Sequence, residues 1–460
     1  MICEEKNKSN LKFQNLTING QSSLKGEVKI SGAKNSALVL IAASILTNET
    51  INLDNVPYLS DIEKMKNILK SLGVKFSTKI NKKNNLIINT KNLKTSEHLP
   101  LDQVKGLRAS FFCIGPLLTK MGKASLALPG GCNIGERPIN EHINGLKKLG
   151  AKIEIKNGVV KASLNDKKSL IGSEIKLSCP SVGATETLIM AASLAKGKTT
   201  IINAAREPEI QDLCKMLNKM GAKIKGEGQS EITIEGVTKL KGCSHKVIPD
   251  RIEAGTFLIA SAATFSSITI SPVIPNHLDS VLDKLKESGS EISINGNTIS
   301  INTKKLKSVN MKTAPFPGFP TDLQAPFTAL MSIAEGESKI SETIYENRMN
   351  HIDSLKKMGA NIEVNNNTAF IKGVKSLKGN QLTGSDLRST AAIIIAAITA
   401  TGTSIVEGLD HLDRGYESFE SKLNVLGSNI TRNEAEDDLF LEQLKGEYKS
   451  INTNAKYQAA

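Results

Sequence analysis

Short apolar runs alternate with amphipathic segments along this chain, and one phrase recurs six times. In it, leucines at helical spacing precede a glycine, and a segment of alternating apolar and polar residues follows, as in AKIEIKNGVVKAS at 151–163. The glycines are Gly73, Gly150, Gly221, Gly289, Gly359 and Gly427, at intervals of 77, 71, 68, 70 and 68 residues. We expect each glycine to end an amphipathic helix in the left-handed conformation, before a strand. The spacing predicts a repeated supersecondary unit.

Each unit also carries alanine-rich apolar residues ahead of the glycine phrase, and usually a short strand such as KTTIINAA. The clearest apolar runs are 37–46, 187–195, 255–263, 326–336 and 390–402. The unit is therefore predicted as strand, helix, strand, helix, strand, strand. Six such units predict an α/β protein of two domains with three units each.

The two ends of the chain complement each other in this scheme. The sixth unit has a single strand after its glycine, whereas the chain begins with two strand-like segments, 11–18 and 26–31. We infer that the N-terminal strands complete the last domain and that the chain crosses between domains twice. The predicted domains are 34–248 and 11–33 plus 249–432, followed by a tail, 433–460, that we expect to be flexible.

Composition is that of a soluble protein, with 39% hydrophobic and 23% charged residues in 460. The longest apolar runs are about ten residues, too short to span a bilayer, and the N-terminus lacks a signal-peptide pattern. We therefore expect a cytoplasmic protein without membrane insertion. The six cysteines have neither paired nor metal-ligand spacing, so neither a metal site nor a disulfide framework is predicted.

The net charge of +13 comes mostly from dispersed lysines, because only eight of the 59 basic residues are arginine. With 4% aromatic residues, base-stacking platforms for nucleic acid are disfavoured, and a solvated lysine surface is the simpler interpretation. Nucleic-acid binding through the charge stays an open alternative. Seven of the eight arginines lie in segments with glycine, proline or acidic residues, which suggests a cleft that binds anions.

Two segments place polar residues where anion binding or proton transfer is plausible. In ISGAKNSAL, Lys34 and Asn35 lie near a predicted helix start, where backbone donors favour an anion, although a capping turn with a solvated lysine fits equally. In FPGFPTDLQAPF, prolines stiffen the loop around Asp322, which could act as a general base or simply cap the next helix.

Helix starts and a glycine-rich loop supply further candidates. Arg108 and the pair Asp386 and Arg388 precede apolar helices, but a cap and a surface ion pair would also explain them. In LPGGCNIGERP, Cys132 lies near Arg137, whose charge could ease ionisation of the thiol. The local sequence by itself favours a simply packed cysteine. No P-loop and no GxGxxG fingerprint occurs, which disfavours adenylate transfer and nicotinamide chemistry.

Taken together, the ordered motifs resemble those of the enolpyruvyl transferases that act on UDP-N-acetylglucosamine. The motifs are SGAKNSAL, LRAS, LPGGCNIGERP, PSVGATET, NAAREPEI, PDRIEAGTF, FPTDLQA, ENR, DLR and HLDRGYE, and the resemblance covers Leu11 to Arg432. It implies two inside-out α/β barrel domains with the active site between them. The implied reaction joins phosphoenolpyruvate to the 3-hydroxyl of UDP-N-acetylglucosamine and releases phosphate, which begins peptidoglycan precursor synthesis. It also implies that no cofactor or metal is needed, and we expect a monomer.

The resemblance further implies roles for individual residues. Cys132 would protonate the methylene carbon of phosphoenolpyruvate, form its covalent adduct, and react with epoxide antibiotics of the fosfomycin type. Asp322 would accept the proton of the sugar hydroxyl, and Lys34 and Arg414 would complete the catalytic set. The residues implied to bind phosphoenolpyruvate are Lys34, Asn35, Arg137 and Arg414. Those implied to bind the UDP-sugar are Arg108, Arg137, Pro138, Ile139, Asn140, Glu141, Ser181, Val182, Gly183, Asp322 and Ile344.

Two positions depart from the family pattern, and two alternatives remain. Asn140 stands where the family usually has aspartate, and Cys179 with Pro180 stands where some members place a lysine, which puts two nucleotide contacts in doubt. The shikimate-pathway enolpyruvyl transferase shares the fold but lacks this cysteine loop. A weakly active paralogue that binds UDP-sugar in a regulatory role is the second alternative.

Overall fold

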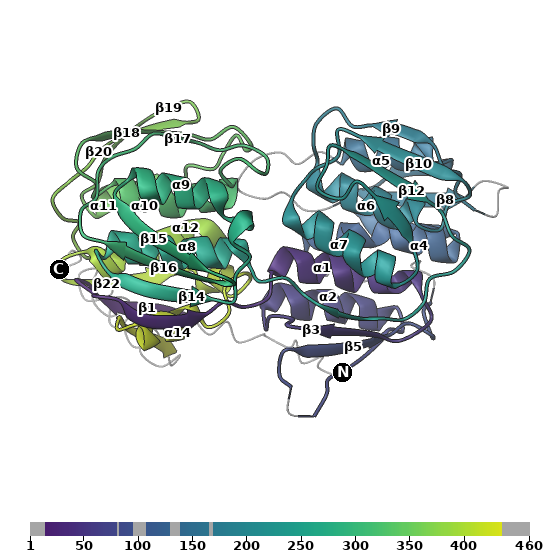
Figure 1. The fold of residues 1–460 in the computed structure, drawn as a ribbon, viewed down its shortest axis with the longest axis horizontal. Coiled ribbons are helices and arrows are strands. Elements are labelled where there is room, and N and C mark those ends of the chain that lie inside the picture. Colours follow the sequence, from purple (N-terminus) through teal and green to yellow (C-terminus); the bar gives the residue numbers. More distant parts are fainter. Residues whose placement is uncertain (1–13, 81, 95–106, 129–138, 165–168, 435–460) are drawn as a thin grey trace, which may run out of the picture.

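The computed structural model describes all residues except 1–13, 81, 95–106, 129–138, 165–168 and 435–460. The described part has two hydrophobic cores, which Figure 1 shows as two halves side by side. We call the residues around the core from Ala33 to Val247 the first half. The second half surrounds a core formed by 16–30 and 252–430. The domain boundaries expected from the sequence stay a prediction.

Apolar helices occupy the interior of both halves. They are α1 (Lys34–Ala43), α4 (Ile114–Met121), α6 (Val182–Ala192), α8 (Arg251–Ala263), α10 (Gln324–Met331) and α12 (Leu387–Thr399). α8, α10 and α12 pack against one another, and their residues are almost all buried. Because such helices are apolar all round, they must be enclosed, and the strands lie outside them (Figure 1). The predicted apolar helices are confirmed.

Amphipathic helices lie between these and the surface. They are α2 (Ser60–Ser71), α5 (Asn140–Lys148), α7 (Pro208–Lys219), α9 (Asp279–Glu287), α11 (His351–Lys357) and α14 (Phe419–Val425), with a short α13 (Leu409–Leu412). The repeated glycine follows each of the first six, with a φ between 87° and 111°. Only glycine adopts this conformation without strain, so the predicted helix caps are confirmed.

The strands that the structure describes form six sheets, one for each predicted unit. Their orders are β13-β3-β5-β4, β6-β8-β7, β9-β10-β12-β11, β2-β14-β16-β15, β17-β18-β20-β19 and β21-β22-β1-β23. The bounds in the first half are β3 (Ile51–Asp54), β4 (Lys75–Ser77), β5 (Asn85–Asn89), β6 (Lys123–Ala127), β7 (Ala151–Lys156), β8 (Val159–Leu164), β9 (Glu174–Lys176), β10 (Lys198–Ile202), β11 (Lys223–Lys225), β12 (Glu231–Glu235) and β13 (Ser244–Lys246). In the second half they are β1 (Gln14–Asn19), β2 (Lys25–Lys29), β14 (Ser267–Ser271), β15 (Ser290–Asn295), β16 (Thr298–Thr303), β17 (Met311–Lys312), β18 (Glu337–Ser341), β19 (Asn361–Asn365), β20 (Thr368–Lys372), β21 (Gln381–Thr383), β22 (Thr403–Glu407) and β23 (Asn429–Glu434).

Five of these sheets share one plan, in which the first two strands of the order given are parallel and the other pairings are antiparallel. In the three-stranded sheet β6-β8-β7 both pairings are antiparallel. Residues 174–235 and 311–372 each run through strand, helix, strand, helix, strand, strand, so the predicted unit and the α/β class are confirmed. In the sixth sheet, β1 occupies the place that the unit's last strand takes elsewhere, between β22 and β23. The strands of the described residues form separate sheets rather than one closed barrel.

The chain passes between the halves at two adjacent segments. β2 pairs with β14 of the second half, and the chain then enters α1 of the first; β13 pairs with β3 of the first half before the chain enters α8. The two crossing segments, 30–33 and 247–250, are joined because Ala33 N donates to Ile248 O at 2.8 Å and Asp250 N to Ser31 O at 2.9 Å. The starts of α1 and α8 are therefore held together.

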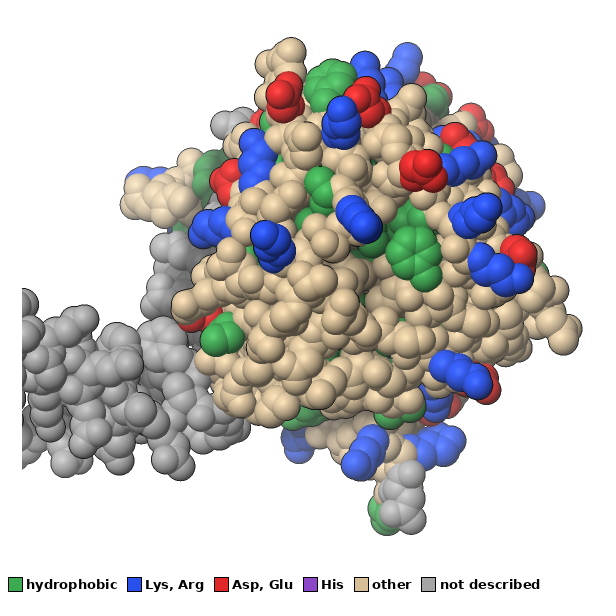
Figure 2. Space-filling view, turned by 90° about the vertical axis from the view of Figure 1, so that its left-hand side faces the viewer, with side chains coloured by type: hydrophobic (Ala, Val, Ile, Leu, Met, Phe, Trp, Pro, Cys, Tyr) green, Lys and Arg blue, Asp and Glu red, His purple; other side chains and the backbone are tan. Residues whose placement is uncertain are grey.

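Charged side chains are dispersed over the surface of the second half. On the face that Figure 2 shows, lysine and arginine side chains lie apart from one another and among acidic ones. Within the described residues, no helix combines the length and apolarity needed to cross a membrane.

A second set of glycines lies directly after strands, and the backbone that follows an apolar helix approaches each of them closely. A Cβ on Gly373, after β20, would lie 1.6 Å from Ala334 O, and one on Gly236, after β12, would lie equally close to Ala195 O.

We predict that Gly373→Ala lowers the free energy of unfolding by about 3 kcal/mol, because backbone must move. Gly359→Ala, with a left-handed φ but open space, should lose about 1 kcal/mol. Urea unfolding measures both, and equal losses would contradict the clash.

Candidate active site

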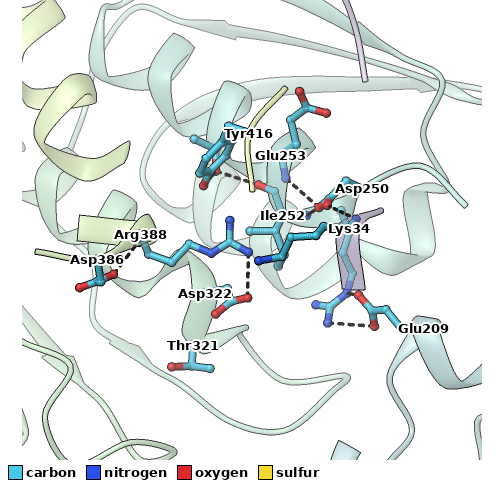
Figure 3. Close-up of polar contacts among 12 residues, drawn as sticks. Lys34, Glu209, Asp250, Ile252, Glu253, Thr321, Asp322, Asp386, Arg388 and Tyr416 are labelled. Atoms are coloured by element: carbon cyan, nitrogen blue, oxygen red, sulfur yellow. Dashed lines mark hydrogen bonds and ion pairs between the residues drawn. The ribbon is translucent and has the colours of Figure 1, made fainter. Parts of the chain in front are cut away.

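Lys34 is the first residue of α1 and lies at the junction of the two halves. Its backbone N donates to Asp250 Oδ2 at 3.1 Å, and its Nζ lies 3.3 Å from Asp61 Oδ2. Figure 3 shows its side chain directed toward Arg388 and Asp322. Burial lowers the pKa of Lys34, and the charges of Arg388 and Arg414 act in the same direction, against Asp61. The sequence prediction of a lysine at a helix start is confirmed.

Asp61 joins this lysine to a cation from the other half. Its Oδ1 accepts from Arg414 Nε at 3.0 Å, and its side chain is 3% exposed. Lys34 and Arg414 thus converge on one carboxylate, which is the arrangement that binds an anion. Sequence analysis missed Asp61, because an acid in the first turn of α2 is ordinarily explained by the helix dipole.

Asp322 lies on a 3-10 turn (Thr321–Leu323) before α10, between two guanidinium groups. Arg348 Nη2 donates to its Oδ1 at 2.6 Å and Arg388 Nη2 to its Oδ2 at 3.0 Å. Asp322 makes no cap hydrogen bond to α10, so the helix-cap alternative was wrong. Burial raises its pKa, but the charges of Arg388 and Arg348 outweigh this and hold the pKa well below its usual range.

Arg388 is held from both ends. Asp386 caps α12 by accepting from Arg388 N at 2.9 Å and Ser389 N at 3.1 Å, and the Arg388 guanidinium lies 5.2 Å from the Tyr416 ring centroid. Tyr416 in turn hydrogen-bonds Thr256 at 2.9 Å. The cap expected of Asp386 is confirmed, but the Arg388 side chain is buried rather than part of a surface ion pair.

Further contacts between the halves lie around the charged residues described above. Arg251, at the start of α8, pairs with Glu209 of α7 through its Nε at 3.1 Å, and Glu207 accepts from Phe316 N at 3.4 Å. Burial raises the pKa of Glu207, against the Arg251 charge. By contrast, Arg206 donates to Gly228 O within its own half, outside this group.

A second group of predicted residues lies in the first half, around the N-terminus of α6. Ser181 caps that helix by accepting from Ala184 N at 3.4 Å, and a Cβ on Gly183 would touch the His142 ring at 3.2 Å. Arg108 begins a 3-10 turn (Arg108–Cys113), and its charge acts on His142. This group provides a helix N-terminus and an arginine for an anionic ligand.

The remaining predicted residues are distributed as follows. Ile139 precedes α5, Asn140 is its first residue, Val182 begins α6, and Asn35 is exposed in the first turn of α1. Glu141 Oε1 accepts from Ser178 Oγ at 2.6 Å. Ile344 N donates to Glu342 Oε1 at 2.8 Å, and Glu342 Oε2 accepts from Thr321 Oγ1 at 2.8 Å. Glu342 therefore connects the loop of Ile344 to the turn that carries Asp322. Cys132, Arg137 and Pro138 lie outside the described residues.

The arrangement combines several cations with one ionised carboxylate whose side chain is 26% exposed. It can bind a small molecule with several negative charges and place a base beside it. Among the described side chains, no three metal-ligating groups come together. Sequence analysis counted Arg348 and Arg388 among arginines suggestive of an anion cleft, but it missed that both hold Asp322.

The family model described as EPSP synthase (3-phosphoshikimate 1-carboxyvinyltransferase) matches residues 18–423. The chain belongs to this family of enolpyruvyl transferases. A relative from Prochlorococcus marinus strain MIT 9301, named UDP-N-acetylglucosamine 1-carboxyvinyltransferase, is 69% identical over 94% of each chain. One from strain AS9601 with the same name is 65% identical over 98% of each.

Solved structures of enolpyruvyl transferases have the same fold. The enolpyruvyl transferase NikO from Streptomyces tendae matches 92% of this chain and all of its own, with a TM-score of 0.83 at 22% identity. EPSP synthase from Acinetobacter baumannii matches the same shares with a TM-score of 0.70 at 20% identity. These matches support the fold alone, and they agree with the α/β class predicted from the repeats.

His142 gives this enolpyruvyl transferase a predictable response to acid. Burial lowers its pKa to about 3 from 6.5, with help from Arg108, and its Nδ1 lies 3.0 Å from Thr187 Oγ1. Between these pH values the unfolded chain binds a proton that the folded chain does not. We therefore expect His142 to reduce the free energy of unfolding by about 1.4 kcal/mol for each pH unit below 6.5.

Urea unfolding of the wild type and His142→Gln at pH 7.5, 6 and 5 measures this slope. His142→Gln should flatten the decline, while His411→Gln, a change at a partly exposed histidine, serves as the control. Parallel slopes for wild type and His142→Gln would show that His142 is protonated in the folded protein.

Proposed function

We propose that this enolpyruvyl transferase moves the enolpyruvyl group of phosphoenolpyruvate to the 3-hydroxyl of UDP-N-acetylglucosamine and releases phosphate. The convergence of Lys34, Arg414 and an ionised Asp322 between the halves carries the proposal. The names of relatives 65–69% identical supply the acceptor. This step begins peptidoglycan precursor synthesis.

Lys34 and Arg414 are the proposed ligands of the phosphate and carboxylate of phosphoenolpyruvate, with Asn35 and Arg137 beside them. Their present partner, the Asp61 carboxylate, shows that both cations can approach one anion. The Lys34 side chain is 11% exposed, so little water screens its contact with an anion. The cations would also stabilise charge on the tetrahedral intermediate before phosphate leaves.

Proton transfer is assigned to two residues on opposite sides of the bond that forms. Cys132 would donate a proton to the methylene carbon, which makes the adjacent carbon electrophilic, and could also hold the covalent adduct. Asp322 would take the proton of the attacking hydroxyl. Its low pKa keeps it ionised but makes it a weak base, so the transfer depends on the hydroxyl becoming acidic as its oxygen bonds to that carbon.

The nucleotide sugar is assigned to the group around the N-terminus of α6. Ser181 to Gly183 offer backbone donors at the helix start, and Arg108 supplies a cation nearby. The segment from Arg137 to Glu141 and Ile344 would complete the contacts. Asn140, uncharged where the family usually has aspartate, leaves the uridine contact there to be tested.

The printed names of related proteins differ in the acceptor. The family model names 3-phosphoshikimate, whereas the highly identical full-length relatives name UDP-N-acetylglucosamine. Because identity to the solved EPSP synthase is 20%, that likeness supports the fold and not its acceptor. We further propose that the protein acts as a cytoplasmic monomer, without metal or organic cofactor, and binds no nucleic acid.

Phosphate release measures this reaction directly. We expect release only when phosphoenolpyruvate and UDP-N-acetylglucosamine are both present, and none when shikimate 3-phosphate replaces the sugar. Cys132→Ala and Asp322→Ala should lower kcat by about 10²- to 10⁴-fold, the usual contribution of a general acid or base. Cys243→Ala, a change at a partly buried cysteine to which no role is assigned, is the control. Unchanged turnover in both site variants would refute the mechanism, and no turnover by the wild type would favour the regulatory alternative.

The pH profile tests how Asp322 is held. Removing the Arg348 charge by Arg348→Gln should raise the pKa of Asp322, so the acid limb of kcat/KM should move to higher pH. Arg206→Gln changes the same charge at a site that donates only to a loop of the first half, and should leave the limb in place. An unshifted limb in Arg348→Gln would mean that Asp322 ionisation does not limit the reaction.

A further inference from the structure

A cavity of about 540 Å³ lies at the two crossing segments, and we call it the crossing cavity. Five lysines line it: Lys29 at the end of β2, Lys246 at the end of β13, Lys82 and Lys83 between β4 and β5, and Lys422 of α14. They come from four separate parts of the chain and from both halves. None of the residues assigned above to catalysis or substrate binding lines this cavity.

The two carboxylates in the wall are already engaged by neutral donors. Asp54 Oδ1 accepts from Asn85 Nδ2 at 2.7 Å. Glu417 accepts from Ser31 Oγ at 2.5 Å through one oxygen and from Tyr58 N at 3.0 Å through the other. Among the described residues, neither acid makes an ion pair with a lysine of the cavity.

The lysines differ in what they contact. Lys422 pairs with the buried Glu253 at 2.5 Å and forms part of the wall. Lys29, Lys82, Lys83 and Lys246 are exposed, and none of these four makes an ion pair with the residues that the structure describes. Like charges collected in a concave surface raise the local concentration of anions. Four ammonium groups around one cavity therefore favour a ligand with several negative charges.

We propose that the crossing cavity binds a polyphosphate group, with Lys29, Lys82, Lys83 and Lys246 as its cationic ligands. The volume lies in the range of small-molecule sites, about 300–1,000 Å³. Lysine ammonium groups bind phosphate as point charges and need no fixed planar geometry. No aromatic side chain lines the cavity, so it offers no surface on which a base could stack. Free tripolyphosphate and the triphosphate of ATP should consequently bind alike.

Protection of lysines from acylation tests this proposal residue by residue. The intact protein is treated with an amine-acylating reagent, with and without tripolyphosphate, and each lysine is quantified by mass spectrometry at constant ionic strength. We expect Lys29, Lys82, Lys83 and Lys246 to be protected several-fold. Lys147 and Lys148, exposed on α5 away from the cavity, provide the internal control. Equal protection of the control pair, or no protection of the cavity lysines, would overturn the proposal.

Matched double variants then measure affinity by calorimetry. Lys29→Gln with Lys246→Gln should weaken one tripolyphosphate-binding event by at least about tenfold, since two phosphate contacts are lost. Lys147→Gln with Lys148→Gln removes the same charge and should bind as the wild type does. Any binding at Lys34 and Arg414 persists in both variants and is thereby distinguished. ATP without magnesium forms the second arm: equal affinity supports recognition of the phosphates, and much tighter ATP binding would contradict it.

Discussion

The carboxylate of Asp250 holds the starts of two helices that belong to different halves. Its Oδ1 accepts from Ile252 N at 2.8 Å and Glu253 N at 3.0 Å, which caps α8, and its Oδ2 accepts from Lys34 N, which begins α1. One cap of this kind contributes about 1 kcal/mol to stability. Here it also sets the position of Lys34, so the cationic part of the site depends on it.

The charged groups of the site are paired with one another before any ligand binds. Arg348 and Arg388 are each 6% exposed and share the Asp322 carboxylate, while Asp61 holds Lys34 and Arg414. Burying ions costs several kcal/mol each unless they are paired, so the network is explained by the geometry it imposes rather than by stability. Donors fixed in advance need no reorganisation when charge develops during a reaction.

Both candidate sites depend on how the halves meet. Arg414 reaches Asp61 across the junction, and Arg251 reaches Glu209. The crossing cavity likewise takes its lysines from both sides of the crossing segments. β2 pairs with β14 and β13 pairs with β3, so each half completes its own sheets and the halves meet at the crossing segments and through side chains.

Local chemistry was enough to predict the repeat, the glycine caps, the apolar helices and the position of Lys34. A left-handed glycine such as Gly150 or Gly427 is required by the conformation of its own helix end, and an all-apolar helix must be buried whatever its neighbours are. The tertiary structure alone decided that Asp322 pairs with two arginines instead of capping α10, and that Asp61 joins Lys34 to Arg414. These partners are 26 to 353 residues apart in sequence, and an ion pair depends on which elements meet in space rather than on the pattern around either residue.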